Sequence, residues 1–427
     1  MYKIKNTRLK LESRISIYTK YFIVPKSNLY IAYLFFVWFL FPFFSIFLVL
    51  FFISQVQLHI RQYNFLFFLM SMSFALLAYT QVSLAAMDTD IVRYYNSYQF
   101  MVGSSFSLNS YLIFEDVLTY SFMFVNILLV YFFKNVQIIS LFWTFFIYML
   151  FFLTVLKLFS IEGIRCTKEN LFWVCFISLF GLILFTQVTE TIKNAAAFAL
   201  FFYLFACFLA KENLMKIFIL YFIGVGIHSS ILMLFPLFFY KWINSKLLFC
   251  FFLISIFLSS LNLMEILMEL LPDVGYLGLI LKRVEHYALE GENLFSIRYV
   301  LILFFVFCTA LLLLKRKVFN EENKFLNIVL LYLIIATLNY SNFDGFVRFV
   351  NFIQFIVVFV FIPFLRDKKR NQSIIAIFFI VFLVTNLQMT YSRTISPHLD
   401  YRSCYMDNSL SKILFSNVVD YLTFKAY

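Results

Sequence analysis

The sequence has little charge, and this shortage excludes most soluble proteins. Only 13% of the 427 residues are charged, about half of the share that a soluble domain carries. No low-complexity linker separates one part of the chain from another, and the sequence has no clear internal repeat. Because no soluble domain is present to carry a basic patch, the net charge of +12 does not indicate nucleic-acid binding.

Cysteine is scarce as well, and its spacing carries no chemistry. No two of the six cysteines stand in C-x-x-C spacing. The pattern therefore predicts neither a metal site nor a disulfide framework, and we expect no cofactor. The positions are Cys166, Cys175, Cys207, Cys250, Cys308 and Cys404.

Long apolar runs are what the sequence has in abundance. Hydrophobic residues make up 63% of the chain, and Phe alone occurs 64 times. A run of about 20 residues is long enough to cross a hydrocarbon core about 30 Å thick, and these runs lack the alternation of barrel strands. The predicted fold class is all-α, a polytopic transmembrane helix bundle of about 11–12 membrane segments with no soluble domain. The segments run at 30–53, 64–86, 112–133, 136–159, 171–189, 193–210, 217–240, 247–263, 297–314, 324–341, 346–365 and 373–391.

The distribution of basic residues predicts which helix ends face the cytoplasm. Lys and Arg accumulate in cytoplasmic segments, and they are dense in 1–28, 315–317 and 366–370. We therefore expect a cytoplasmic N-terminal segment over 1–28, a transmembrane bundle over 29–391 and a periplasmic tail over 392–427.

Twelve uniform crossings contradict this assignment, because a cytoplasmic N-terminus would then place both basic turns outside. Segment 30–53 is interrupted by Pro42 and is one candidate for a re-entrant helix. Segment 217–240, with two glycines and a proline in its middle, is the other, since broken backbone needs shelter within the protein. The first option places 87–111 outside and the second places it inside. The loop 264–296 faces outward in either case.

Polar residues in or beside these segments are candidate functional residues, because an ionisable group costs roughly 2.5–3.5 kcal/mol to insert. Each also has a structural alternative, such as a solvated loop, a hydrogen-bonded core histidine or an Asp–Arg pair at offset four. One cluster shares a helical face at offsets of three and four, namely Gln187, Glu190 and Asn194. The other candidates are Asp88, Asp90 and Tyr94; Lys193; His228 and Ser230; Arg283, Glu285 and Tyr287 in the outward loop; and Asp344, Arg348 and Asn351.

The order of these motifs resembles that of bacterial polysaccharide polymerases of the Wzy and EpsG type, which include the O-antigen polymerases. An acid–tyrosine stretch, 87–95, follows an early helix. Lys193 and Asn194 open an Ala-rich helix where the family more often has Arg first. His228 is followed by serines and a proline, and Arg348 begins an aromatic helix that ends in proline.

The resemblance implies a multi-pass glycosyltransferase of the bacterial inner membrane. It would join oligosaccharide repeat units carried on undecaprenyl diphosphate at the periplasmic face, without a metal, for O-antigen or a related polysaccharide. A chain-length regulator and a flippase in the same membrane are the implied partners.

The same resemblance gives the candidate residues roles. Arg348 and Arg283 are expected to stabilise the diphosphate leaving group, and the general base remains open among Asp344, Glu285, Asp90 and His228. The residues expected to bind substrate are Asp88, Asp90, Tyr94, Lys193, Asn194, Ser230, Tyr287 and Asn351.

Two other functions stay open. A flippase for lipid-linked oligosaccharide would carry out no bond chemistry, and it would favour a polar path across the membrane and a repeated half-structure. An O-antigen ligase would use similar chemistry on a different acceptor, and a longer outward loop would be expected for it.

Overall fold

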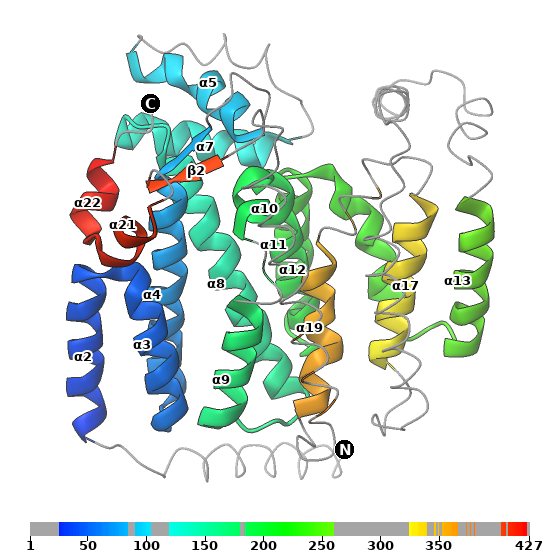
Figure 1. The fold of residues 1–427 in the computed structure, drawn as a ribbon. Helices are drawn as coiled ribbons and strands as arrows, with labels where there is room; N and C mark the ends of the chain where they lie inside the picture. The colour runs from blue at the N-terminus through cyan, green and yellow to red at the C-terminus, as the bar shows by residue number, and fades with distance from the viewer. Residues whose placement is uncertain are drawn as a thin grey trace.

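The computed structural model is a bundle of helices with one short two-stranded ribbon at one end (Figure 1). The predicted all-α membrane bundle is therefore confirmed, apart from that ribbon. We call the end that carries the ribbon the upper end, as in Figure 1. The structure describes residues 25–83, 90–103, 119–179, 183, 185–259, 324–339, 346, 349, 352–365, 373, 376, 380, 403–406 and 409–424.

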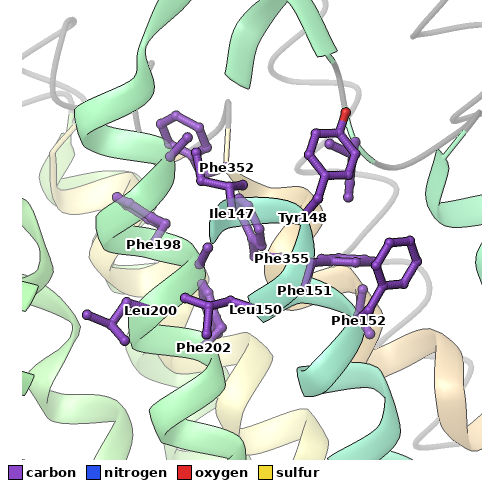
Figure 2. Close-up of a cluster of buried hydrophobic side chains, with 14 of the residues drawn as sticks. Ile147, Tyr148, Leu150, Phe151, Phe152, Phe198, Leu200, Phe202, Phe352 and Phe355 are labelled. Atoms are coloured by element: carbon purple, nitrogen blue, oxygen red, sulfur yellow. The ribbon is translucent and has the colours of Figure 1, made fainter. Parts of the chain in front are cut away.

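Three helices among the described residues are long and apolar enough to cross a membrane. They are α4 (Ile60–Tyr79), α8 (Ile138–Ile161) and α11 (Ile192–Leu209). Helix α8 packs against both of the others. Phe74 stacks on Tyr148 with their ring centroids 4.5 Å apart. Lower down, side chains of α8, α11 and α19 (Ile353–Phe364) form the apolar cluster drawn in Figure 2.

Segment 30–53 forms a hairpin of two short helices, α2 (Pro25–Leu40) and α3 (Pro42–Gln55). A proline at the first position of α3 starts a new helix, as its fixed backbone angle favours. The rings of Tyr30 and Phe52 lie 6.0 Å apart, so the two arms are antiparallel. The Lys168 ammonium, at the start of α9 (Lys168–Ile177), donates to the Gln55 carbonyl oxygen at 3.1 Å. The segment therefore enters and leaves at the lower end, as the first option predicted.

Segment 217–240 also doubles back. Helix α12 (Leu214–Val225) rises from the lower end, and the 3-10 helix η3 (Ser229–Phe239) descends beside it. The Tyr221 hydroxyl donates to the Ile231 carbonyl oxygen at 3.1 Å, which ties the two arms together. The sequence offered the two broken segments as alternatives, and the structure contains both.

Two later helices run parallel to each other. They are α13 (Ser245–Ser259) and α17 (Lys324–Leu338). Ser245 Oγ bonds Asn327 Oδ1 near their lower ends, and the hydroxyls of Ser255 and Thr337 bond near their upper ends, both at 2.6 Å. Parallel neighbours require the chain between them to return to the lower end, as the predicted crossing at 297–314 does. Residues 264–296, 315–317 and 366–370 lie outside the described residues, so their sidedness stays a prediction.

Helix α7 (Tyr120–Phe133) corrects the expectation that 112–133 crosses the membrane. At its start, the Ser121 N–H donates to the Gly226 carbonyl oxygen at 2.8 Å. Just past its end, the Asn135 amide donates to the Tyr79 hydroxyl at the top of α4. Figure 1 shows the helix lying across the upper end. Its 14 residues span about 21 Å, which is short of the membrane thickness.

These three departures resolve the conflict in sidedness. The α2–α3 hairpin, the α12–η3 hairpin and α7 each remove one crossing from the twelve that hydropathy alone suggests. Removing three crossings, an odd number, moves every loop after the third one to the opposite side of the membrane. With the remaining segments crossing as predicted, both basic turns come to the same side as the N-terminal segment.

The C-terminal tail returns to the upper end. Strand β2 (Ser403–Tyr405) pairs antiparallel with β1 (Gln81–Ser83), directly after α4. Helices α21 (Leu410–Phe415) and α22 (Val418–Thr423) lie above the α2–α3 hairpin (Figure 1). The ring of Phe415 contacts those of Phe41 and Phe44 at 6.2 and 5.8 Å. The tail thus covers the hairpin and lies on the same side as the top of α4.

Labelling of single cysteines tests the hairpin. In a variant whose native cysteines are replaced by alanine, cysteines at the exposed positions Leu29 and Gln55 should react with an impermeant maleimide from the same side of the membrane. A cysteine at the exposed Ser411 should react from the opposite side. Reaction of positions 29 and 55 from opposite sides would mean that segment 30–53 crosses.

Candidate functional site

Two predicted substrate-binding residues meet at the upper end of the bundle. Tyr94 lies on α5 (Asp90–Gly103) and is 9% exposed, and Lys193 lies at the start of α11. The Lys193 ammonium lies 5.7 Å from the centroid of the Tyr94 ring, close enough for a cation–π contact. The Tyr94 ring also packs on Phe122 of α7, with ring centroids 5.0 Å apart. The site therefore joins α5, α7 and α11.

Asn194 is buried beside this pair. It is 3% exposed, and its side-chain oxygen Oδ1 has no hydrogen-bond partner. One turn further along α11, Phe198 contacts Phe349 and Phe352 at 5.6 and 5.0 Å. Because residues four apart share a helix face, Asn194 lies on the side of α11 that faces Phe349 and Phe352.

The His228 motif forms the apex of the α12–η3 hairpin. The imidazole is 9% exposed, and its Nδ1 accepts the Ser230 backbone N–H at 3.1 Å, which caps η3. The predicted break in segment 217–240 therefore falls at His228, and its side chain is buried. A neutral imidazole has one acceptor nitrogen, so this bond leaves Nε2 as a donor and makes His228 a poor general base. The Ser230 hydroxyl has no hydrogen-bond partner.

Glycine is required at the same apex because α7 begins against it. A Cβ at Gly226 would lie 2.4 Å from Ser121 Oγ and 2.5 Å from the Tyr120 ring. A Cβ at Gly224 would lie 2.8 Å from the end of the Ile231 side chain, which can move. Of the two glycines in the motif, Gly226 is therefore the one that sets the packing of α7.

Asp90, a predicted base, is paired with Arg93 one turn away on α5. One oxygen of the Asp90 carboxylate is therefore already engaged by the guanidinium. Among the described residues, no three His, Cys, Asp or Glu side chains lie close enough to hold a metal ion. Metal independence stays a prediction.

The remaining predicted site residues lie outside the described residues, so their roles stay predictions. They are Asp88, Arg283, Glu285, Tyr287, Asp344, Arg348 and Asn351.

The sequence also left some neighbours of the site unpredicted. Phe122 supports Tyr94, and Tyr405 reaches α10 (Phe185–Glu190) from the tail by bonding the Thr189 hydroxyl at 2.6 Å. In a chain with 64 phenylalanines, an aromatic residue carries little signal by itself. Only the pairing of β1 with β2 brings Tyr405 to this position.

Comparison with known proteins gives one match. The model of the EpsG family matches residues 64–403. That range includes most of α4, all of α5, α7, α8 and α11, and the His228 motif. Every predicted site residue also lies within it. No curated protein and no solved structure matches the chain.

Alanine substitutions at the two glycines test which of them is needed for the packing of α7. Gly226→Ala should lower the melting temperature of the detergent-purified protein, because overpacking of this kind typically costs about 1–3 kcal/mol. Gly224→Ala, the matched control, should change it little, since its nearest contact is the flexible end of Ile231. Equal melting temperatures for the two variants would show that the contact of α7 with Gly226 is dispensable.

Proposed function

Because the chain belongs to the EpsG family of polysaccharide polymerase-like membrane proteins, we propose that it joins lipid-linked oligosaccharide repeat units into a surface polysaccharide. The donor and the acceptor are carried on undecaprenyl diphosphate in the bacterial inner membrane, and the reaction takes place at the periplasmic face. The product is O-antigen or a related polymer. A chain-length regulator and a flippase in the same membrane are the expected partners.

The observation that carries this proposal is the contact between Tyr94 and Lys193 at the upper end of the bundle. Both residues belong to motifs of the family resemblance, and they come from segments far apart in the sequence. The basic-turn argument makes the upper end the periplasmic one. A cation held there, beside aromatic side chains, suits the diphosphate of a lipid-linked sugar. As an ammonium, Lys193 offers a point charge where an arginine would offer a two-pronged fork.

The reaction is a glycosyl transfer. A hydroxyl of the acceptor unit attacks the anomeric carbon of the growing chain and forms the glycosidic bond. The bond from that carbon to the diphosphate oxygen breaks, and the electron pair leaves with undecaprenyl diphosphate. The hydroxyl proton passes to a general base. Cations near the leaving oxygens stabilise the charge that develops on them.

Arg348 and Arg283 are our candidates for that stabilisation, together with Lys193. Asp344 and Glu285 are the preferred candidates for the general base. Of the other two, Asp90 is already paired with Arg93, and the acceptor nitrogen of His228 already bonds the Ser230 N–H. Asp344 and Glu285 are therefore the two of the four candidate bases without such a known contact.

The packing of the middle of the bundle favours a polymerase over a flippase. Figure 2 shows Phe151, Phe198, Phe202 and Phe355 filling the space between α8, α11 and α19. Each of these four side chains is at most 2% exposed. A transporter of oligosaccharides needs a polar path across the membrane, whereas an enzyme that works at one face needs polar residues at that face alone. The described candidates of α5, α11 and the hairpin apex all lie toward the upper end.

The polysaccharide profile of a deletion strain tests the function. We expect surface lipids capped with a single repeat unit, and restoration of long chains by the wild-type gene. Complete loss of the surface antigen would instead indicate a flippase or a ligase, and an unchanged long-chain profile would contradict the proposal.

Substitutions of Arg348 test the predicted diphosphate contact. Loss of a transition-state charge stabiliser typically lowers the rate by about 10²–10³. Arg348→Ala should therefore abolish long chains. Arg348→Lys should remove most of them, because an ammonium lacks the planar fork that binds two phosphate oxygens. Chain length on gels and abundance in membranes should be measured for both variants.

Asp344→Asn is the matched control for that experiment. If Arg348 only anchors Asp344 in a structural pair, Asp344→Asn should be as damaging as Arg348→Ala, and Arg348→Lys should be nearly silent. Wild-type polymer at wild-type abundance in Arg348→Lys would rule out the diphosphate contact.

A further inference from the structure

Helix α7 presents an apolar face to the outside of the protein. None of its 14 residues is charged. Its inner face packs on α8, where the Trp143 ring stacks on Phe122 at 5.1 Å and the Trp143 indole N–H donates to Asn126 Oδ1 at 2.7 Å. An exposed apolar patch on a folded protein marks a contact with a membrane or with a partner. The outer face of α7 consists of Tyr120, Phe124, Leu128, Tyr131 and Phe132, all of them exposed.

The neighbouring helix α5 presents a polar face instead. Helix α5 packs against α7 and lies further from the middle of the bundle in Figure 1. Its exposed side chains include Arg93, Asn96 and Gln99, which are spaced three apart and share one side of the helix. A helix at the surface of a protein carries such polar side chains on the side that faces water. Two helices in contact at one end of the bundle therefore have outer faces suited to different surroundings.

The outer face of α7 continues onto an exposed apolar side of α12. Met215, Ile219 and Phe222 are exposed on α12 at offsets of four and three. Most of α12 lies in the predicted membrane segment 217–240, so these side chains are expected to contact acyl chains. The Tyr120 hydroxyl donates to the Phe222 carbonyl oxygen at 3.0 Å. The start of α7 is therefore held directly against a surface that lipid covers.

The other end of α7 lies at the level where the hydrocarbon ends. Helix α4 has 20 residues and is about 30 Å long, which matches the thickness of the hydrocarbon core. The Asn135 amide, just past α7, donates to the hydroxyl of Tyr79 at the top of α4. The Lys134 ammonium lies 4.6 Å from the centroid of the Tyr131 ring. Lysine and tyrosine are typical of this level, because their apolar parts lie in lipid while their polar ends reach water.

We propose that the outer face of α7 is inserted into the upper leaflet of the bilayer, so that the boundary between lipid and water runs between α7 and α5. Membrane lipid is the occupant of this face for two reasons. The face carries no charge, and it is continuous with the lipid-facing side of α12. The polar side of α5 then lies in water, just above the boundary.

This boundary passes beside the Tyr94–Lys193 pair. The contact of Tyr94 with Phe122 joins α5 to α7, and the Lys193 ammonium lies against the same tyrosine ring. Lys193 is thereby held near the level of the lipid phosphates. A lipid-linked sugar could bring its diphosphate to this cation with its lipid in the bilayer and its sugars in water. That consequence rests on the proposed function, whereas the insertion of α7 does not.

Spin labels on the full-length protein in phospholipid vesicles test the insertion. Phe124→Cys and Phe132→Cys are made in the variant whose native cysteines are replaced by alanine, and each cysteine receives a nitroxide. Both positions are well exposed, at 60% and 72%. Collisions of the nitroxide with oxygen, which concentrates in hydrocarbon, are compared with collisions with a water-soluble nickel chelate. Ile219→Cys on α12 is the control for lipid, and Asn96→Cys and Gln99→Cys on α5 are the controls for water.

Oxygen should collide more often than the nickel chelate with labels at positions 124 and 132, as it should at position 219. The order should be reversed at positions 96 and 99. More frequent collisions with the chelate at 124 and 132 would place α7 in water and overturn the proposal. Rare collisions with both reagents would show that a second copy or a partner protein covers the face, which would also overturn it. Two labelled positions keep the test decisive if one variant fails to fold.

The proposed function has a separate readout. If the deletion strain still makes long polymer, the polymerase assignment fails, and the spin labels still decide where α7 lies. If long polymer requires the gene while the labels on α7 report water, the insertion of α7 alone is wrong.

Discussion

The backbone carbonyl of Gly226 accepts hydrogen bonds from the N–H groups of Ser121 and Phe122, at 2.8 and 3.2 Å. The first N–H groups of a helix have no partner within it, and a broken membrane helix leaves carbonyl groups in the same condition. The N–H groups at the start of α7 and the carbonyl group at the end of α12 therefore form the hydrogen bonds that each would otherwise lack. Without α7 the hairpin apex would expose its backbone to lipid, and without the apex α7 would have no fixed end. The position of His228 follows from this exchange.

Apolar packing and the polar candidate residues lie at different depths of the bundle. Phenylalanine side chains fill the space between α8, α11 and α19 in the middle of the bundle. The Tyr94–Lys193 pair lies above this packing, at the upper end. In a lipid-linked sugar the charged diphosphate lies between the apolar lipid and the neutral sugars, so a diphosphate at this pair would leave the sugars above it. The protein need only hold one charged group at the interface to place the others.

Much of this fold was predictable from the sequence. Hydropathy predicted the helix bundle. The proline at position 42 indicated one broken helix, and the glycines before His228 indicated the other. Tyr94 and Lys193 were predicted to share a site, and the structure brings them together. Three segments that do not cross would bring the basic turns to the side that their charge predicts, and that sidedness stays a prediction.

The rest depends on contacts that no local pattern records. Hydropathy does not distinguish a helix that crosses from one that lies across the end, so α7 was expected to span the membrane. Strands β1 and β2 lie about 320 residues apart, and neither short sequence gives a sign that the two pair.

The ribbon imposes an order on biogenesis. Strand β1 is synthesised early, whereas its partner is made about 320 residues later, from Ser83 to Ser403, which takes on the order of tens of seconds of translation. Throughout that interval the edge of β1 is unpaired, and Tyr405 is absent from the region between α4, α8 and α10. A nascent chain therefore inserts its helices with the upper end still open. The upper end is completed only after the intervening segments have been made, so an unfinished chain in the membrane lacks the bond from Tyr405 to α10.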